Sequence, residues 1–196
     1  MSLVEQIKTI QRHCGAEVDG IFGPRTAAAV LAELQKDSSD GHRPPLQELD
    51  ARTRATIATL DVKAQAAFTT FALLAKATAA TFGCDYVAIS GHRTWEEQDE
   101  LFRRVPQVTR AKGGYSNHNF GIAADFAVFR GKVYLDDSKP ELARKVHTAC
   151  AAHAKDCGLE WGGDWKRMKD FPHYEMRTAL TMAEKRKVYQ EKGTVL

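Results

Sequence analysis

The sequence predicts an α+β fold: a small helical module at the N-terminus, then a domain in which helices flank a small antiparallel sheet. Apolar residues recur at helical spacing near the N-terminus and again over residues 50–82, which predicts helices there. Short apolar runs bounded by turn residues, as at 86–90, predict strands. Residues 37–50 contain Ser, Gly and a Pro-Pro pair, as linkers do. The expected parts are therefore a module at 1–36, a linker at 37–50 and a larger domain at 51–196.

The N-terminal module is expected to hold two helices joined by a loop. Leu3, Ile7 and Ile10 repeat at helical spacing, and residues 18–23 form a glycine-containing loop. Pro24 then begins a second helix over residues 25–35, because proline at the first helical position loses no intrahelical hydrogen bond.

The larger domain is expected to begin with one long helix over residues 50–82. Its core positions are Phe68, Phe71, Leu74 and Ala75, and Gly83 is its C-terminal stop. The later elements are a strand at 86–90, a helix that a capping box opens at 94 and that ends near 104, a loop at 105–117, strands at 122–129 and 132–135, a helix at 141–157, a glycine-rich turn at 161–165, a strand at 173–176 and a charged helix from about residue 179.

Composition and charge narrow the classes of protein. The formal net charge of +3 is too small to predict nucleic-acid binding, although it suits an anionic polymer. No run approaches the roughly 18 apolar residues of a membrane span, so no membrane insertion is expected. The first residues lack the basic and apolar regions of a signal peptide, which predicts synthesis in the cytoplasm. The four cysteines form no CxxC pair and are expected to be free and buried, and a monomer is expected.

Two short segments, 116–125 and 170–173, contain the residue types of a metal site. His118, Asp125 and His173 offer two imidazole nitrogens and one carboxylate oxygen, a common ligand set for catalytic zinc. Three protein ligands leave a fourth position for water, whose pKa zinc lowers to about 7. Asp170, three residues before His173, could then take the proton of that water. The plainer alternatives are a loop or core histidine, a solvated carboxylate, and a helix or turn cap at Asp170.

Four motifs of the larger domain resemble a family of zinc peptidases. Residues 116–125 match the SxHxxGxAxD signature of the zinc peptidases that include D-Ala-D-Ala dipeptidases and carboxypeptidases. Residues 90–98, 112–116 and 158–165 look like the L-alanyl-D-glutamate endopeptidase branch, to which phage endolysins belong. The resemblance implies a Zn2+ enzyme that cleaves the L-Ala–D-Glu bond of the bacterial peptidoglycan stem peptide. It also implies an endolysin that acts on the cell wall after its release.

The resemblance implies roles for individual residues. His118, Asp125 and His173 would hold the zinc ion, and Asp170 would act as the general base. Arg93 would stabilise the developing oxyanion. The alternative interpretation of Arg93 is a surface charge before a helix.

Other polar and aromatic residues have supporting or structural interpretations. Ser116 is expected to support the site or bind substrate, because no base is placed to make it a nucleophile. Trp161 and Trp165 either line the substrate groove or pack over the site. Glu175 competes with Asp170 as the base and is expected to play a supporting or structural role. The remaining expectations are a loop position for His92, solvent or helix-face positions for His13, His42, His147 and His153, and a solvated helix face for Lys185, Arg186 and Lys187.

The N-terminal segment resembles a peptidoglycan-binding module, because residues 18–26 look like its VDGxFGxxT core. Two alternatives to the endopeptidase stay open. One is a D-Ala-D-Ala carboxypeptidase with the same metal site, against which the glycine-tryptophan turn at 161–165 argues. The other is a non-catalytic zinc-containing wall-binding protein, against which the presence of both Asp170 and Arg93 argues.

Overall fold

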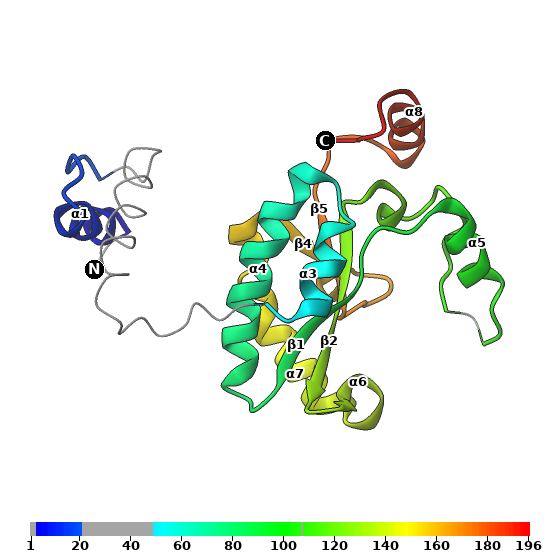
Figure 1. Ribbon diagram of the computed structural model, residues 1–196, viewed down its shortest axis with the longest axis horizontal. Coiled ribbons are helices and arrows are strands. Elements are labelled where there is room, and N and C mark those ends of the chain that lie inside the picture. Colours follow the sequence, from blue (N-terminus) through cyan, green and yellow to red (C-terminus); the bar gives the residue numbers. More distant parts are fainter. Residues whose placement is uncertain (1–2, 21–48, 107) are drawn as a thin grey trace. The chain divides into compact units, whose positions relative to one another are not determined.

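The computed structural model describes residues 3–20, 49–106 and 108–196 (Figure 1). The chain divides into two compact units, Met1–Leu46 and Gln47–Leu196. The predicted helix over 25–35, residues 21–23 of the predicted loop and the predicted linker up to residue 48 lie outside the described residues. Within the described part, no helix is both long and apolar enough to cross a membrane.

The first unit begins with α1 (Leu3–His13), where the apolar spacing predicts a helix. Gln11 is fully buried, and its side-chain amide joins the helix to the following loop. Its Oε1 accepts a hydrogen bond from the Gly20 backbone N–H at 2.9 Å, and its Nε2 donates to Asp19 Oδ1 at 2.7 Å. These two bonds fix the start of the glycine-containing loop against α1.

An antiparallel sheet of five strands organises the second unit, and the α+β prediction is confirmed. The strand order is β1-β2-β5-β4, while β3 pairs with β2 outside that path. The strands are β1 (Asp85–Ser90), β2 (Ala123–Arg130), β3 (Val133–Tyr134), β4 (Leu159–Trp161) and β5 (His173–Met176). The helices are α3 (Ala51–Ala58), α4 (Val62–Ala80), α5 (Trp95–Arg103), α6 (Leu135–Ser138), α7 (Pro140–Ala151) and α8 (Met182–Lys192), with 3-10 turns at Asn117–Phe120, Lys155–Cys157 and Gly162–Asp164.

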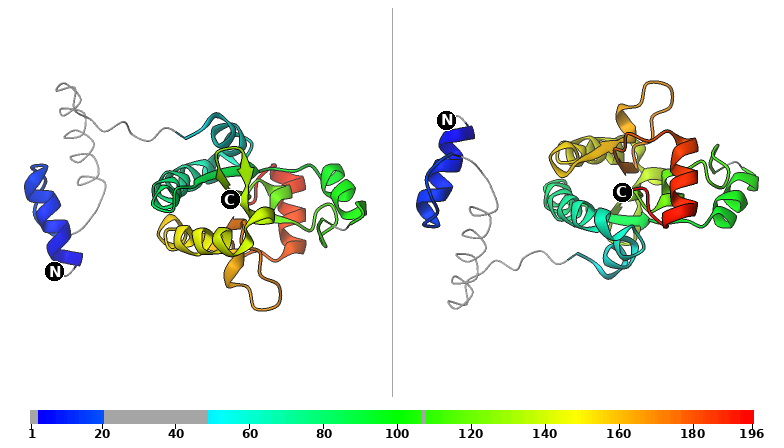
Figure 2. Two further views of the ribbon diagram at one scale, coloured as in Figure 1. Left: turned by 90° about the horizontal axis from the view of Figure 1, so that it is seen from below. Right: turned by 90° about the horizontal axis from the view of Figure 1, so that it is seen from above.

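The hydrophobic core lies between the sheet and two helices. The helices α4 and α7 lie side by side, and α4 packs on β1 (Figure 2). Phe71 of α4 meets Phe126 of β2 edge to face, with ring centroids 5.2 Å apart, and Tyr86 of β1 stacks on Phe126 at 5.4 Å. Such pairs contribute about 0.5–1.5 kcal/mol each beyond their buried area. Because side chains alternate along a strand, the neighbours of these core residues point to the opposite face of the sheet.

The predicted long helix over 50–82 is two helices. Asp61 interrupts it, because its side chain accepts a hydrogen bond from the Lys63 backbone N–H and caps a new helix, α4. Leu74 is 40% exposed, so its predicted core position is wrong, whereas Phe68, Phe71 and Ala75 are fully buried. The buried face of α4 therefore follows Phe68, Phe71 and Ala75 and leaves Leu74 outside it.

Five other sequence expectations need correction. The predicted strand at 132–135 ends at residue 134 because Leu135 begins α6, and the predicted helix at 141–157 ends at Ala151, before a separate 3-10 turn. The predicted turn at 161–165 includes the last residue of β4, and the C-terminal helix begins at Met182 behind a capping box. The cysteines are free, but only Cys84 and Cys150 are buried, whereas Cys14 and Cys157 are partly exposed.

His147 lies on α7 and is buried, so of the two expected positions, in solvent or on a helix face, the solvent position is wrong. Its Nδ1 lies 2.7 Å from the Tyr86 hydroxyl, and its Nε2 lies 2.7 Å from Asp136 Oδ1. The Tyr86 hydroxyl also bonds the Tyr174 hydroxyl at 2.9 Å. Burial raises the pKa of Tyr86 well above its ordinary value, so its hydroxyl stays protonated. This polar chain ties α7 to β1 and to β5.

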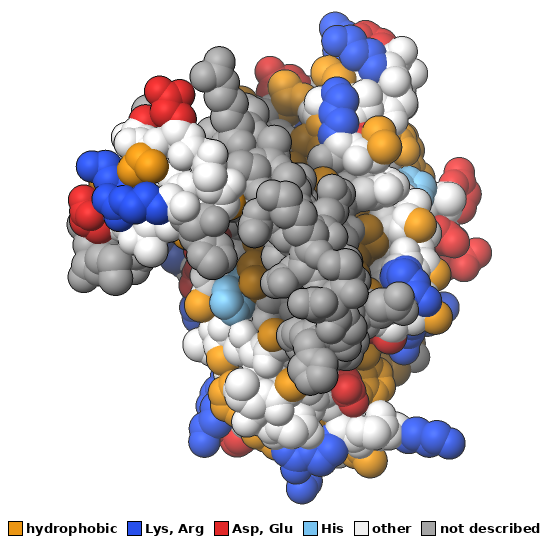
Figure 3. Space-filling view, turned by 60° about the vertical axis from the view of Figure 1, so that its left-hand side comes forward, with side chains coloured by type: hydrophobic (Ala, Val, Ile, Leu, Met, Phe, Trp, Pro, Cys, Tyr) orange, Lys and Arg blue, Asp and Glu red, His pale blue; other side chains and the backbone are white. Residues whose placement is uncertain are grey.

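Charged side chains of both signs are spread over the described surface. On the face drawn in Figure 3, Lys and Arg side chains alternate with Asp and Glu side chains. The drawn face therefore carries mixed charge, in keeping with the small net charge of the chain.

Candidate metal centre

Strand pairing places two of the candidate ligands next to each other. Asp125 of β2 lies opposite His173 of β5, and on its other side it pairs with Ser90 of β1. The adjacent residues Ala124 and Tyr174 belong to the hydrophobic core. By alternation, Asp125 and His173 share the other face of the sheet.

The third candidate ligand, His118, lies in the 3-10 turn Asn117–Phe120 that precedes β2. Ser116 caps this turn, because its Oγ accepts a hydrogen bond from the His118 backbone N–H at 3.4 Å. Gly121 ends the turn with a φ of 66°, and a Cβ atom there would lie 2.7 Å from the Asp61 backbone nitrogen. Glycine is therefore required where the chain turns from His118 into β2.

The three side chains converge on one point. His118 Nε2 and His173 Nδ1 each lie 3.1 Å from Asp125 Oδ1, and the two nitrogens are 3.3 Å apart. All three ligand atoms lie within 4.8 Å of one another. Both histidines are buried, so two nitrogens and one oxygen face a shared, sheltered position.

The second nitrogen of each histidine has an acceptor. His118 Nδ1 lies 2.7 Å from the Gly91 carbonyl oxygen, which accepts its hydrogen, so Nε2 is left as the ligand atom. His173 Nε2 lies 2.9 Å from Glu175 Oε2, which leaves Nδ1 as the ligand atom. Such partners fix the orientation of metal-binding histidines. Two histidines and one carboxylate, with these partners, fit a zinc ion.

The charges of the site favour a cation. Burial raises the pKa of Asp125, but the neighbouring His118 and His173 outweigh it and hold that pKa well below its ordinary value. Burial lowers the pKa of His173, but hydrogen bonds to Asp125 and Glu175 outweigh it and raise that pKa to about 9. The surroundings of His173 therefore stabilise positive charge, which a bound metal ion can supply.

Arg93 holds the carboxylate of Asp125. Its Nη2 donates to Asp125 Oδ2 at 2.5 Å, and its Nε donates to Ser90 Oγ at 2.9 Å. Oδ1 of Asp125 then faces the two histidines, while Oδ2 faces the guanidinium group. Arg93 also lines the cavity over the metal centre, where the predicted oxyanion would form.

Asp170 lines that same cavity, which measures about 1000 Å³. Its backbone N–H donates to the Gly162 carbonyl oxygen at 3.1 Å, which ties its loop to the turn after β4. A Cβ atom on Gly162 would lie 2.5 Å from the Asp170 carbonyl oxygen, so the close approach depends on glycine. Burial, and then the charge of Asp125, raise the pKa of Asp170 above its ordinary value. A raised pKa suits a carboxylate that takes up and returns a proton.

The structure places the remaining candidate residues in different surroundings. Ser116 lines the cavity and caps the turn of His118. Trp165 also lines it, with its ring centroid 5.0 Å from that of His173. Trp161 lies on a second cavity, and its Nε1 donates to the Phe171 carbonyl oxygen at 2.8 Å, beside Asp170.

Lys185 was not expected near the site, and its predicted position on a solvated helix face is wrong. It is only 7% exposed, and its Nζ donates to Asn117 Oδ1 at 2.8 Å. Asn117 Nδ2 in turn donates to Glu175 Oε2 at 2.7 Å. A chain of polar contacts thus runs from α8 to His173. Residue spacing does not indicate the contact between Lys185 and Asn117, because the two residues lie 68 positions apart in the sequence.

Two histidines and one carboxylate that converge beside a cavity are an arrangement typical of zinc metallopeptidases. Residues 109–176 match the model of the peptidase family described as D-alanyl-D-alanine carboxypeptidase. The matched segment contains all three candidate ligands, His118, Asp125 and His173, and this donor set fits zinc.

Known proteins resemble a larger part of the chain. The peptidoglycan L-alanyl-D-glutamate endopeptidase CwlK of Bacillus subtilis (strain 168) is 42% identical over 112 residues. That match covers 50% of this chain and 64% of the relative, so the chain spans less than two thirds of the relative's length. Among solved structures, the L-Ala D-Glu endopeptidase ChiX of Serratia marcescens has a TM-score of 0.45 at 22% identity and covers 68% of this chain and 94% of its own. The vancomycin resistance D,D-pentapeptidase VanY in complex with Zn(II) has a TM-score of 0.42 at 16% identity, over 69% of this chain and 80% of its own.

Proposed function

We propose that this chain is a zinc peptidase that hydrolyses the L-Ala–D-Glu bond of the bacterial peptidoglycan stem peptide. The observation that carries the proposal is the convergence of His118, Asp125 and His173, with Asp170 on the wall of the same cavity. The choice of bond is supported by the 42% identity to a relative named as an L-alanyl-D-glutamate endopeptidase.

His118 Nε2, Asp125 Oδ1 and His173 Nδ1 would hold the metal ion. Bound zinc supplies a Lewis acid that activates water at neutral pH and polarises a carbonyl group. Asp170 accepts a proton from the attacking water and then donates it to the amine of the leaving D-Glu. Its raised pKa favours the second transfer, because the protonated carboxyl is the proton donor.

Arg93 has two tasks in this mechanism. Its contact with Asp125 Oδ2 holds the carboxylate in place, and its position on the cavity wall offers N–H groups to a developing oxyanion. A planar guanidinium group suits both tasks, because it presents several donors in fixed directions. Ser116 holds the turn that carries His118 and takes no chemical step.

The second candidate function is a D-Ala-D-Ala carboxypeptidase, which the description of the matched family favours. The two candidates share the metal centre and differ in the bond that is cut. A non-catalytic zinc protein is the third candidate, and the position of Asp170 on the cavity wall argues against it.

We further propose that the protein acts as a phage endolysin. In this proposal it is made in the cytoplasm, works as a monomer on the cell wall after release, and binds neither nucleic acid nor the membrane interior. The support is the resemblance of residues 18–26 to a peptidoglycan-binding module, together with the small net charge of +3.

Mass spectrometry of purified peptidoglycan tests the activity. The zinc-loaded protein is expected to release stem peptides that begin at D-Glu with a free amine, and a zinc chelator should stop this release. Loss of only a terminal D-Ala would establish the carboxypeptidase instead. Unchanged peptidoglycan would favour the non-catalytic protein.

A further inference from the structure

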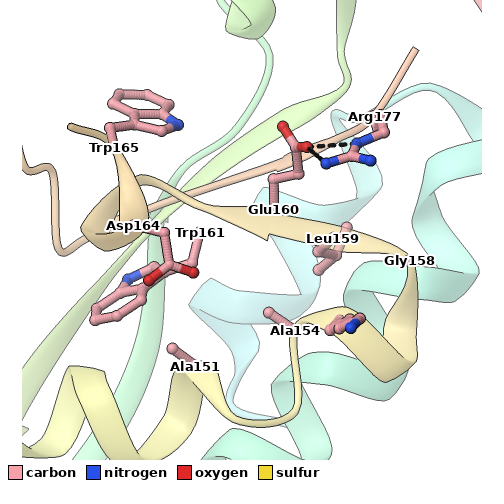
Figure 4. Close-up of a pocket in the computed structure, with 10 residues that line it drawn as sticks. Ala151, Ala154, Gly158, Leu159, Glu160, Trp161, Asp164, Trp165 and Arg177 are labelled. Carbon is pink, nitrogen blue, oxygen red and sulfur yellow. Dashed lines mark hydrogen bonds and ion pairs between the residues drawn. The ribbon is translucent and has the colours of Figure 1, made fainter. Parts of the chain in front are cut away.

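A second cavity of about 500 Å³ lies beside β4 and the turn that follows it (Figure 4). Its lining comes from the end of α7, from β4 and from that turn. This volume falls within the range of about 300–1000 Å³ that is usual for small-molecule sites. The mechanism above does not use it.

Trp165 connects this cavity with the metal centre. It lines both cavities, and its ring centroid lies 5.0 Å from that of His173. In Figure 4 Trp161 and Trp165 extend from the two ends of one short segment. A ligand that spans both cavities would therefore pass over Trp165.

The turn between the cavities begins with two glycines, Gly162 and Gly163, which allow close approach of their neighbours. A Cβ atom on Gly163 would lie 2.3 Å from the Trp161 ring, and one on Gly162 would lie 3.1 Å from His173 Cβ. Trp161 therefore packs directly on the turn, and the turn itself lies against His173. A group bound against them would be only a short distance from the scissile bond.

The charges around the second cavity balance. Of the described residues that line it, two are cationic and two are acidic, and Arg177 is paired with Glu160. Lys155 and Asp164 add one charge of each sign at the exposed rim. An uncharged ligand with hydroxyl and amide groups suits aromatic walls with a balanced polar rim better than a carboxylate-rich peptide does.

We propose that this cavity binds the N-acetylated sugar of the glycan strand that carries the stem peptide. The inference rests on the proposed function, because the sugar is joined to the L-Ala whose bond to D-Glu is cut. One residue spans at most about 3.6 Å, so the sugar next to that alanine lies within reach of a neighbouring cavity. Trp161 and Trp165 supply the apolar surface for the sugar ring, and Asp164 supplies a hydrogen-bond acceptor at the rim.

The test is direct binding of the peptide-free disaccharide of N-acetylglucosamine and N-acetylmuramic acid, with its lactyl carboxyl group amidated so that it is uncharged as in the substrate, followed by NMR of the indole N–H groups. The chain has three tryptophans, and the third, Trp95, lies in α5 and serves as an internal control. The disaccharide is expected to shift the signals of Trp161 and Trp165 and to leave that of Trp95 unchanged. Ala151→Phe, which fills the cavity from the end of α7, should weaken binding on the order of tenfold, or about 1.4 kcal/mol.

Ala152→Phe is the matched control, because residue 152 is exposed and follows the last residue of α7. It should bind the disaccharide as the wild type does. The proposal is overturned if the disaccharide shifts none of the indole signals, if Ala151→Phe binds the disaccharide with the affinity of the wild type, or if the sugar-free tripeptide alone produces the shifts. Because this readout needs no hydrolysis, a protein that binds the sugar but cuts no bond would refute the proposed function and leave the sugar site standing.

Discussion

Glu175 Oε2 accepts a hydrogen bond from His173 Nε2 at 2.9 Å, and this contact decides which nitrogen of His173 faces the metal centre. With Nε2 committed to the carboxylate, Nδ1 is left to face Asp125. Asn117 donates a hydrogen bond to Glu175 from the other side and is itself held by Lys185. The metal centre is therefore supported by residues of the 3-10 turn, β5 and α8.

Glu175→Gln is expected to weaken zinc binding about 10–100-fold, because loss of the negative charge reduces the basicity of His173. Competition with a chromophoric chelator measures the affinity. Glu191→Gln, at an exposed position of α8, should bind zinc as the wild type does. Equal affinity in both variants would show that Glu175 does not support the ligand.

Lys185→Met is expected to lower the free energy of unfolding by about 1–3 kcal/mol, because it leaves Asn117 Oδ1 without its buried donor. Chemical denaturation measures the change. Lys187→Met, at an exposed position on the same helix, should change the free energy by less than about 0.5 kcal/mol. Equal losses in the two variants would contradict a specific role for Lys185.

Asp170→Asn is expected to reduce turnover about 10²–10⁴-fold while one zinc ion per chain stays bound. The amide keeps the volume of the side chain but cannot take up the proton. Hydrolysis of a muropeptide gives the rate, and elemental analysis gives the zinc content. Asp156→Asn, at an exposed position, serves as the control. A variant with full activity would remove Asp170 from the mechanism.

Gly162→Ala is expected to reduce turnover on the order of 10²-fold, because its Cβ would displace the loop of Asp170 by up to about 1 Å. The Cβ would meet the Asp170 carbonyl oxygen at 2.5 Å. Gly131→Asn is the comparison, since no atom lies within 4 Å of its Cβ and asparagine tolerates its positive φ. The idea fails if both variants keep the rate of the wild type.

His147→Leu is expected to lower the free energy of unfolding by about 1–3 kcal/mol for each polar partner left unsatisfied. Those partners are the Tyr86 hydroxyl and the Asp136 carboxylate. Lys145→Leu, at an exposed position of α7, controls for the added apolar side chain. Unfolding curves that coincide for the two variants would show that the buried chain contributes nothing to stability.

Local signals in the sequence were enough for much of the fold and for the candidate ligands. The spacing within 116–125 and 170–173 singled out His118, Asp125 and His173, and strand alternation placed Asp125 beside small residues. The break at Asp61 also had a local signal, because an aspartate can cap a new helix. A local signal also indicated that His147 is buried, because His147 lies four residues after the buried Ala143 and therefore on the same face of α7.

Two supporting contacts of the site had no local signal, whereas Glu175 lies only two residues from His173 and was expected to play a supporting role. The acceptor for His118 is the backbone carbonyl of Gly91, and every residue type offers such a carbonyl. Lys185 reaches Asn117 across 68 residues, so its burial depends on where α8 docks. Such contacts follow from tertiary packing and are invisible to spacing rules.

His118 and His173 are 55 residues apart in the chain, yet their ring nitrogens are 3.3 Å apart. An ion held by both fastens distant segments together much as a covalent cross-link would, in a chain whose four cysteines are free. Closing a loop restricts the unfolded chain, and the restriction grows slowly with loop length. Metal loss would thus loosen the segment between the two histidines as well as abolish the proposed hydrolysis. The lifetime of the folded protein among proteases would then depend on the zinc supply around it.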